Sequence, residues 1–324
     1  MEAESKINKN FDLEKELIVE YEEELYDLKK FIHKHPGGIN ILQHKNHKNI
    51  DTIFKDTNHS IAAEYLLKEY KLNSDSNNKD SLEHLVDWNK PMIAQISKLD
   101  NSYYEWVNSP VDRHLKLFEN DILELFTKTP WYLPLLFWTP VIMFLIFIES
   151  SSFGTSFEMY SKTIMWVALG FCFWTLFEYI MHRFVFHIDV RRFPRLKTFH
   201  FIFHGNHHKV PFDEYRLVFP PFPAAVIAII GYQLLRGLHF CGLISHPVLF
   251  IAGILIGFLC YDMTHYYIHF ASPTNTYLYN LKRYHYKHHF VSYERGFGVS
   301  NKFWDGIFST EIPLNKLKYL IKWK

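Results

Sequence analysis

Histidine is the residue type whose number and spacing most strongly predict chemistry in this sequence. The chain has 20 histidines in 324 residues, and half of them fall in four short groups that read HRFVFH, HGNHH, HYYIH and HYKHH. These groups contain His182, His187, His204, His207, His208, His265, His269, His285, His288 and His289. Neutral imidazole ligates borderline metals such as iron or zinc rather than magnesium or calcium. Because ten nitrogen ligands are too many for one ion, the sequence predicts a dinuclear metal site.

Helix geometry accounts for most of the spacings. His265 and His269 differ by about 40° around a helix, so both can reach one ion. The three histidines of each HxxHH group lie within an arc of about 100°, which lets them serve two adjacent ions. His182 and His187 are about 140° apart on an ideal helix, so we expect that helix to end or loosen between them. Structural zinc sites usually close at four ligands and favour cysteine, and no cysteine lies in any group.

Two carboxylates precede ligand positions within one helical turn. Glu178 comes four residues before His182, and Asp262 comes three residues before His265. A ligating histidine usually donates its second ring nitrogen to a carboxylate or carbonyl, so both are candidate partners; the alternative is that they reach the lipid headgroups. Histidines outside the groups are expected to be structural (His114, His200, His239, His246) or solvent-facing (His33, His44, His47).

The elements that position these groups are predicted to be membrane-spanning helices. Four predominantly apolar segments approach the roughly 20 residues that a bilayer span needs: Leu133–Ile148, Ile164–Met181, Pro221–Leu238 and Pro247–Tyr261. We read them as two hairpins. Basic residues concentrate between the second and third segments and after the fourth, on the side that carries the histidines. The positive-inside rule therefore places both termini and all four groups in the cytosol.

The N-terminal part carries a separate motif. Tyr26–Gly38 reads YDLKKFIHKHPGG, and His59 follows in NHSIAAEYLL. This pattern resembles the cytochrome b5 family, which implies a b-type haem with His35 and His59 as its axial ligands. Two axial histidines leave no open coordination position, so such a haem transfers electrons and does not bind oxygen. The alternative is a turn with incidental histidines.

Composition supports this organisation. The sequence predicts a mainly α integral-membrane protein with a helical, histidine-rich dimetal cap and a small α+β domain. The expected parts are 11–73 for the haem domain, 74–130 for a linker (polar at 73–81) with amphipathic helices, and 131–324 for the membrane domain. A formal charge of +1 argues against nucleic acid as a partner. Three cysteines without a CxxC pair exclude a disulfide scaffold and covalently attached haem.

The combination is similar to the fatty acid 2-hydroxylases, which fuse a cytochrome b5 domain to a membrane hydroxylase domain. Further motifs carry the resemblance: LVDWNKPM, FHGNHHKVPFD, RLVFPP, YDMTHYYIHF and GFGVSNKFWD. It implies O2-dependent 2-hydroxylation of fatty acids or sphingolipid N-acyl chains at a di-iron site that can also hold zinc. It further implies an endoplasmic reticulum location. Electrons would reach the metals through the haem from an NAD(P)H-dependent reductase.

An acyl chain is uniform along its length, so position 2 can be selected only by anchoring the head of the substrate. Arg216, Tyr261, Asp262 and Tyr266 are the candidate anchors. Three alternatives remain open at this point: a sterol or other lipid hydroxylase or desaturase of the same superfamily, a membrane electron carrier, and a structural zinc protein.

Overall fold

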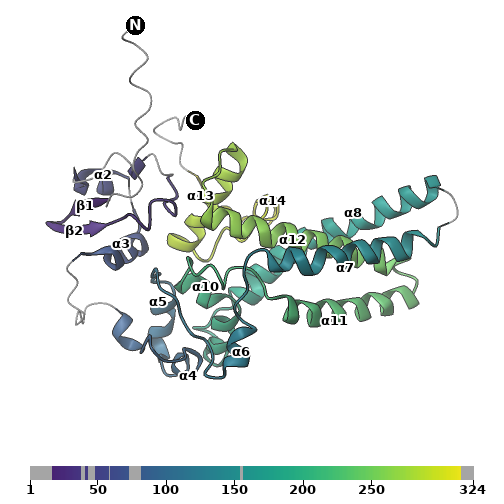
Figure 1. The fold of residues 1–324 in the computed structure, drawn as a ribbon, viewed down its shortest axis with the longest axis horizontal. Coiled ribbons are helices and arrows are strands. Elements are labelled where there is room, and N and C mark those ends of the chain that lie inside the picture. Colours follow the sequence, from purple (N-terminus) through teal and green to yellow (C-terminus); the bar gives the residue numbers. More distant parts are fainter. Residues whose placement is uncertain are drawn as a thin grey trace, which may run out of the picture.

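The computed structural model describes residues 17–37, 41–42, 48–57, 59–72, 82–153 and 156–314. The predicted linker at 73–81 lies outside these ranges, as do Gly38, His44 and His47. Within them the protein is mainly helical, with one small sheet close to the N-terminus (Figure 1). The predicted fold class is confirmed.

Four helices are long and apolar enough to cross a membrane, with mean hydropathies between 1.3 and 1.9. They are α7 (Leu133–Ser150), α8 (Ser156–Ile180, continuing to Phe186), α11 (Pro221–Phe240) and α12 (Pro247–Phe270). They extend together toward one end of the molecule (Figure 1). Helix α8 begins before the predicted Ile164 and α12 ends after the predicted Tyr261. Hydropathy marks only the apolar part of a helix, and both helices continue through polar residues.

Helix α12 is the central helix of the four. About half of its apolar window is buried (56%), against 11–17% for the other three. A Cβ atom on Gly170 of α8 would lie 2.0 Å from the carbonyl oxygen of Phe250, and one on Gly253 would lie 2.1 Å from that of Val167. Only glycine permits backbones to approach so closely within a membrane. This contact fixes the α8 end that carries His182 beside the α12 end that carries His265.

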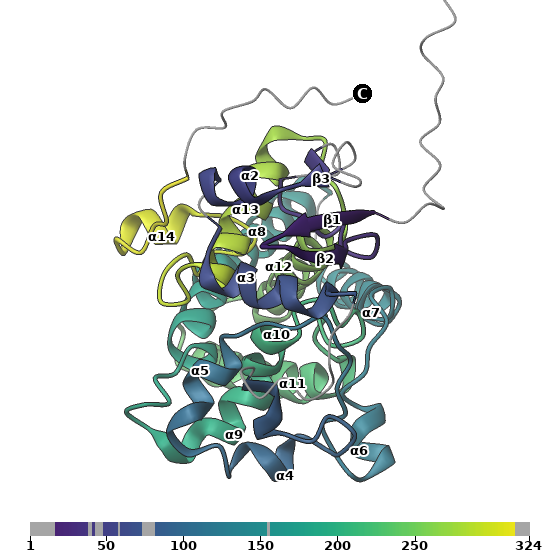
Figure 2. The ribbon, with the colours of Figure 1, turned by 90° about the vertical axis from the view of Figure 1, so that its left-hand side faces the viewer.

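The N-terminal domain is the predicted small α+β unit. Its sheet has the order β2-β1-β3, with β1 (Ile18–Tyr21) antiparallel to β2 (Glu24–Asp27) and parallel to β3 (Lys48–Asn49). Two helices follow, α2 (Asp51–Asp56) and α3 (Ile61–Leu67). Viewed from this domain's side, the sheet and α2 lie over α13 (Thr276–Phe290) at the end of the helical bundle (Figure 2).

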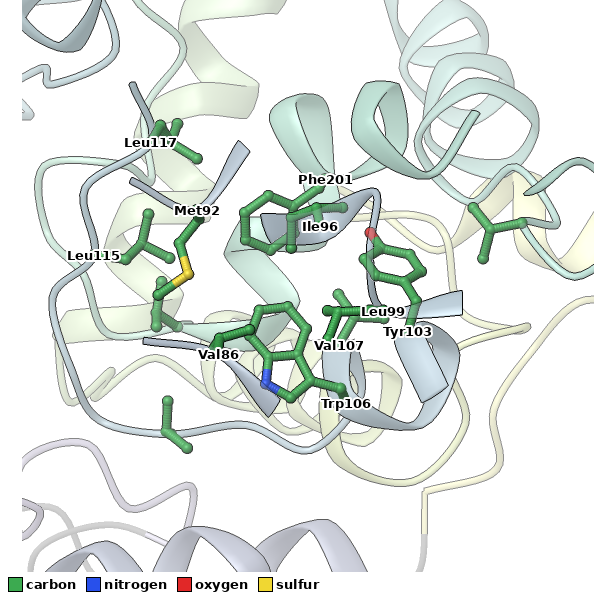
Figure 3. Close-up of a cluster of buried hydrophobic side chains, with 13 residues drawn as sticks. Val86, Met92, Ile96, Leu99, Tyr103, Trp106, Val107, Leu115, Leu117 and Phe201 are labelled. Atoms are coloured by element: carbon green, nitrogen blue, oxygen red, sulfur yellow. The ribbon is translucent and has the colours of Figure 1, made fainter. Parts of the chain in front are cut away.

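The stretch between the haem domain and the first span is more than a linker. It contains short helices, including α4 (Ile93–Ile96), α5 (Tyr103–Val107) and α6 (Asp121–Leu125). Its apolar side chains form most of a separate hydrophobic core, shown in Figure 3. Phe201 and Val210, which flank the HGNHH group, belong to the same core. The stretch before the first span therefore packs against the segment that carries His204, His207 and His208.

Several cations counted toward the membrane orientation are buried inside the protein. Lys209, Arg216 and Lys282 are each less than a tenth exposed. Arg191, Arg192 and Arg195 are exposed. Under the positive-inside rule, these three arginines are therefore the main residues that favour a cytosolic position for this end of the spans.

Candidate metal centre and haem site

Two π-helical turns carry histidines into the centre. The first, η4 (Met181–Phe186), continues α8, and the backbone N–H of His187 donates to the carbonyl of His182 at 3.0 Å. This five-residue hydrogen bond widens the turn and leaves both imidazoles on one side of the helix. The loosening predicted between these two residues is thus present.

The second π-helical turn was not predicted. It spans Phe201–Gly205 (η6) and joins the short helix α10 (Asn206–Lys209). The Asn206 side chain donates to the carbonyls of Phe201 (2.7 Å) and Ile202 (2.9 Å), and its backbone N–H also donates to the Phe201 carbonyl to close the wide turn. The asparagine in HGNHH is the one signal in the sequence that could have indicated this turn.

Five histidines converge on one point, with ligand atoms all within 4.8 Å of one another: His207, His265, His269, His285 and His289. The Nε2 atom of His285 lies 3.0 Å from Nε2 of His265, 2.9 Å from that of His269 and 3.0 Å from that of His289. One ring nitrogen carries at most one proton, so hydrogen bonds cannot account for three such neighbours. Nitrogens about 2.1 Å from a shared ion would be about 3.0–3.4 Å apart. The geometry is that of ligands around a cation.

A second group lies beside the first and contains His182, His187, His204 and His288. Nε2 of His204 is 3.0 Å from Nε2 of His182 and 3.1 Å from that of His208. The Nε2 atoms of His187 and His288 are buried and have no hydrogen-bond partner among the described residues. His208 also stacks on His289 of the first group, with ring centroids 4.2 Å apart. The structure therefore brings all ten predicted ligands together, in two adjoining groups.

Burial keeps these imidazoles in the form that ligates metals. Burial first, and neighbouring imidazoles second, hold the pKa well below its ordinary value for His187, His204, His207, His208, His285 and His289. Nine of the ten histidines are at most 5% exposed. A buried cluster of neutral nitrogen donors fits iron or zinc, and among the described residues both groups consist of imidazoles alone.

Backbone carbonyls, and not the predicted carboxylates, orient two of the ligands. Nδ1 of His182 lies 2.6 Å from the carbonyl oxygen of Phe297, and Nδ1 of His288 lies 2.7 Å from that of Arg295. With Nδ1 donating, each Nε2 lone pair points into the group. The prediction that Glu178 and Asp262 bind histidines was wrong in its contacts, because each accepts hydrogen bonds from backbone N–H groups.

Glu178 instead holds the loop that carries Phe297. Its carboxylate accepts from the N–H groups of Val299 (3.2 Å) and Ser300 (2.9 Å) and from the Ser300 hydroxyl (2.7 Å). From the other side, Asp305 accepts from the N–H groups of Phe297 (2.9 Å) and Gly298 (2.8 Å). Asp305, which our sequence reasoning missed as a site residue, lies within the quoted GFGVSNKFWD motif. Asp262 accepts from Phe219 N–H (3.0 Å) and so fixes the entry to α11.

The remaining anchor candidates divide into two kinds. Arg216 is buried in an ion pair with Glu124, and it donates to Thr127 (2.8 Å) and the Leu115 carbonyl (3.0 Å), so it fastens the α6 region and is not free to bind a ligand. Tyr261 is half-buried, with its ring 5.8 Å from that of His265, and its hydroxyl has no hydrogen-bond partner among the residues that the structure describes. Tyr266 stacks on Trp131 at 5.9 Å.

None of the histidines outside the groups that the structure describes belongs to either cluster, and the side chain of His114 is 75% exposed. Nδ1 of His200 is hydrogen-bonded to the Tyr103 hydroxyl at 2.7 Å. Nδ1 of His239 lies 2.7 Å from the Ile244 carbonyl oxygen, and His33 is exposed. The other two face carboxylates: His114 lies 3.3 Å from Asp213, and His246 lies 2.9 Å from Glu149.

His35 and His59, the two predicted axial histidines, face each other across a gap of haem size. Their ring centroids are 6.4 Å apart. Two imidazoles bound on opposite sides of one iron, with metal–nitrogen bonds of about 2 Å, have centroids about 6 Å apart. Nδ1 of His59 lies 2.9 Å from the Phe54 carbonyl, which leaves Nε2 available, and burial lowers the pKa of this imidazole. The residues present therefore fit a haem with two axial histidines.

These features define a multi-pass membrane protein with a buried all-histidine centre and a small attached haem-type domain. The chain matches the family model of the fatty acid hydroxylases over residues 167–310 and that of the cytochrome b5-like haem/steroid-binding domains over residues 4–73. It is 36% identical to the fatty acid 2-hydroxylase of Rattus norvegicus, covering 89% of each chain. It is 38% identical to the dihydroceramide fatty acyl 2-hydroxylase FAH1 of Arabidopsis thaliana, covering 71% of this chain and 94% of that one.

A solved structure described as full-length scs7p, with only the hydroxylase domain visible, is also similar. Its TM-score is 0.64 at 30% identity, over 79% of this chain and 96% of that one. The chain belongs to the fatty acid 2-hydroxylase family and is a hydroxylating enzyme.

Proposed function

We propose that the protein catalyses O2-dependent 2-hydroxylation of fatty acyl chains at two histidine-bound metal ions. The observation that carries this proposal is the convergence of ten imidazoles, nine of them buried, in two adjoining groups. His207, His265, His269, His285 and His289 would hold one ion, and His182, His187, His204, His208 and His288 the other. Iron is the proposed native metal, since it can exchange electrons; zinc would fit the same donors without turnover.

The reaction consumes one O2, two protons and two external electrons for each C–H bond hydroxylated. One oxygen atom enters at carbon 2 and the other leaves as water, so the substrate bond supplies the other two electrons. Two irons held by these histidines would supply the oxidant for an unactivated C–H bond. The protein's own contribution is to keep the histidines neutral, to keep the centre dry and to hold Phe297 and Arg295 against two ligands.

The two external electrons are proposed to arrive singly through a b-type haem held by His35 and His59. A haem with both axial positions filled suits electron transfer. An NAD(P)H-dependent reductase would restore the reduced haem after each transfer.

The substrate is proposed to be a fatty acyl chain, either free or attached to a sphingolipid base, as the name of the Arabidopsis relative indicates for that protein. Its tail would lie among the spans with its carbonyl end at the histidines. Tyr261 is the favoured anchor, because its ring lies 5.8 Å from that of His265 and its hydroxyl has no hydrogen-bond partner among the described residues; Tyr266 would line the approach. Arg216 and Asp262 are proposed only to shape the site.

The proposed location is the endoplasmic reticulum membrane, with both termini and the histidine centre in the cytosol. The exposed Arg191, Arg192 and Arg195 favour this orientation under the positive-inside rule. The haem domain lies at the same end of the bundle as the histidines (Figure 1).

Expression in cells that lack 2-hydroxy lipids tests the function. Under ¹⁸O2, mass spectrometry should detect acyl chains carrying one ¹⁸O at carbon 2, both in free acids and in ceramides if both are substrates. Replacing His208 or His288 with alanine should abolish the product, whereas His239→Ala, at the far end of α11, should not. If the wild-type protein contains haem and metal yet forms no 2-hydroxylated chain, the proposal is wrong.

A further inference from the structure

The N-terminal domain is fastened to the hydroxylase part by two ion pairs. Lys34 Nζ lies 2.6 Å from Asp112 Oδ2, and both side chains are largely buried, at 20% and 15% exposed. The Tyr70 hydroxyl donates to the same oxygen at 2.6 Å. Next to this contact, Arg113 donates to both oxygens of Glu69, at 2.6 and 2.8 Å. Paired bonds of this kind fix orientation as well as distance.

An apolar contact lies between these ion pairs and the histidines. Leu66 of α3 is buried together with Phe212 and Tyr286, and Phe31 and Phe290 pack against them. Phe212 lies four residues after His208, and Tyr286 directly follows His285 on α13. The haem domain thus touches α13, which supplies two of the five histidines, and the segment that follows His207.

The Tyr286 hydroxyl connects the two sites. It lies 2.8 Å from the carbonyl oxygen of Lys34 and 3.1 Å from that of His269. Lys34 is the residue before the axial candidate His35, and His269 belongs to the five-histidine group. The Tyr286 hydroxyl therefore lies between the backbone of Lys34, next to the candidate haem ligand His35, and the backbone of His269, a candidate metal ligand.

Aromatic rings follow the same course without a break. Phe31 is 5.9 Å from the His35 ring and 6.0 Å from Phe212, measured between centroids. Tyr286 is 6.4 Å from Phe212 and 5.8 Å from the His269 ring. Every step is a van der Waals or edge contact of packed rings. Electrons move faster through packed atoms than across gaps, so this course is the natural connection between the two sites.

We propose that this interface is a built-in docking surface that holds the haem domain in position for electron transfer, with Phe31, Phe212 and Tyr286 as the route to the five-histidine group. The inference rests on the proposed function. In each transfer the haem site loses one electron and the histidine-bound metals gain one, and two transfers complete a turnover. Lys34, Asp112, Glu69 and Arg113 are positioning residues in this arrangement.

The test uses the full chain, loaded with haem and iron, in lipid nanodiscs. The haem is reduced without oxygen, the protein is mixed with O2 and a fatty acid, and haem reoxidation is followed by absorbance. Lys34→Glu should slow reoxidation about tenfold or more, because it removes a charge-assisted hydrogen bond and adds a repulsion. Lys34→Glu combined with Asp112→Lys should restore most of the rate, since the ion pair is re-formed with reversed charges while only the Tyr70 hydrogen bond to Asp112 is lost.

Two further variants distinguish the contribution of the aromatic rings from that of the Tyr286 hydroxyl. Phe212→Leu should slow reoxidation more than Tyr286→Phe, because only the first removes a ring from the route. Tyr277→Phe is the matched control: it loses a hydroxyl-to-carbonyl hydrogen bond (3.0 Å to Ser300) from the same helix, away from the haem domain. It should reoxidise at the wild-type rate.

A second measurement does not depend on turnover. Amide hydrogen exchange near residues 284–290 should increase in Lys34→Glu and return to the wild-type level in the charge-swapped protein. Wild-type reoxidation rates in both Lys34→Glu and Phe212→Leu would overturn the inference, as would failure of the swap to restore either measurement. Absence of any 2-hydroxy product from the wild type would instead refute the proposed function.

Discussion

The hydrogen bonds of Glu178 give the sharpest test of how the centre is held together. Glu178→Ala leaves the buried N–H groups of Val299 and Ser300 without acceptors. Each orphaned buried donor costs about 1–3 kcal/mol, so this variant should lose on the order of 2–6 kcal/mol of unfolding free energy. The loop would no longer press the Phe297 carbonyl against His182.

Glu178→Gln should behave differently. Its amide oxygen can accept from both N–H groups, and its NH2 group can donate to the Ser300 hydroxyl, which both donates and accepts. Neutral hydrogen bonds are weaker than those of a carboxylate, but the side chain no longer carries a buried charge. We expect a loss of about 1 kcal/mol.

Metal retention against graded chelator is the decisive assay, with thermal unfolding measured in the same detergent. Loss of an outer partner of a metal ligand typically lowers affinity about 10–100-fold, and we expect this for Glu178→Ala alone. Equal metal loss in the alanine and glutamine variants would show that the negative charge matters and that the hydrogen-bond argument is wrong.

Three further changes test other parts of the structure. His35→Ala should abolish the haem absorbance band while the metal content stays at the wild-type level, because the two sites use separate histidines. Lys209→Met should destabilise the protein by about 3–5 kcal/mol, because it leaves Glu83 buried without its 2.6 Å partner, and adding Glu83→Leu should recover most of that loss in a denaturation assay. His200→Gln should reduce the loss of stability between pH 6.5 and 4 by up to about 1.4 kcal/mol per pH unit; burial lowers the pKa of His200 to about 4, so in this window only the unfolded chain takes up its proton.

Each of these has an outcome that contradicts it. Joint loss of haem and metals in His35→Ala would mean that the two sites do not form independently. If Lys209→Met is as stable as the parent protein, the Glu83 carboxylate is exposed to water and not buried. For His200, parallel stability curves for parent and variant would show that this imidazole is protonated in the folded protein as well.

The sequence was sufficient to predict the spans, the haem-type domain and all ten histidines that the structure brings together. Each depends on local spacing or on composition: i and i+4 positions, HPGG with a second histidine, or a continuous apolar segment. Even the loosened turn between His182 and His187 follows from their separation, because a five-residue interval does not fit one face of an α-helix. Such features are encoded within one turn or one segment of the chain.

The contacts that orient the histidines are of another kind. His182 binds a carbonyl 115 residues away, and Glu178 binds N–H groups 121 and 122 residues away. Carbonyl and N–H groups are present at every residue, so no side-chain pattern marks the ones that will be used. Proximity in sequence wrongly suggested that Glu178 and Asp262 would serve their nearest histidines, four and three residues on.

Arg216 and Tyr261 were both predicted as anchors for the head of the substrate, and their contacts in the structure differ. An arginine near a predicted site attracts interest as an anion anchor, but a buried guanidinium has five donors that need acceptors. In this fold Glu124, Thr127 and the Leu115 carbonyl, all from the stretch before the first span, accept from its two terminal nitrogens, and Asp213 forms an ion pair with its Nε atom. A tyrosine needs only one partner, and the hydroxyl of Tyr261 has none among the described residues, while its ring lies 5.8 Å from that of His265, so Tyr261 stays the proposed anchor for a substrate carbonyl.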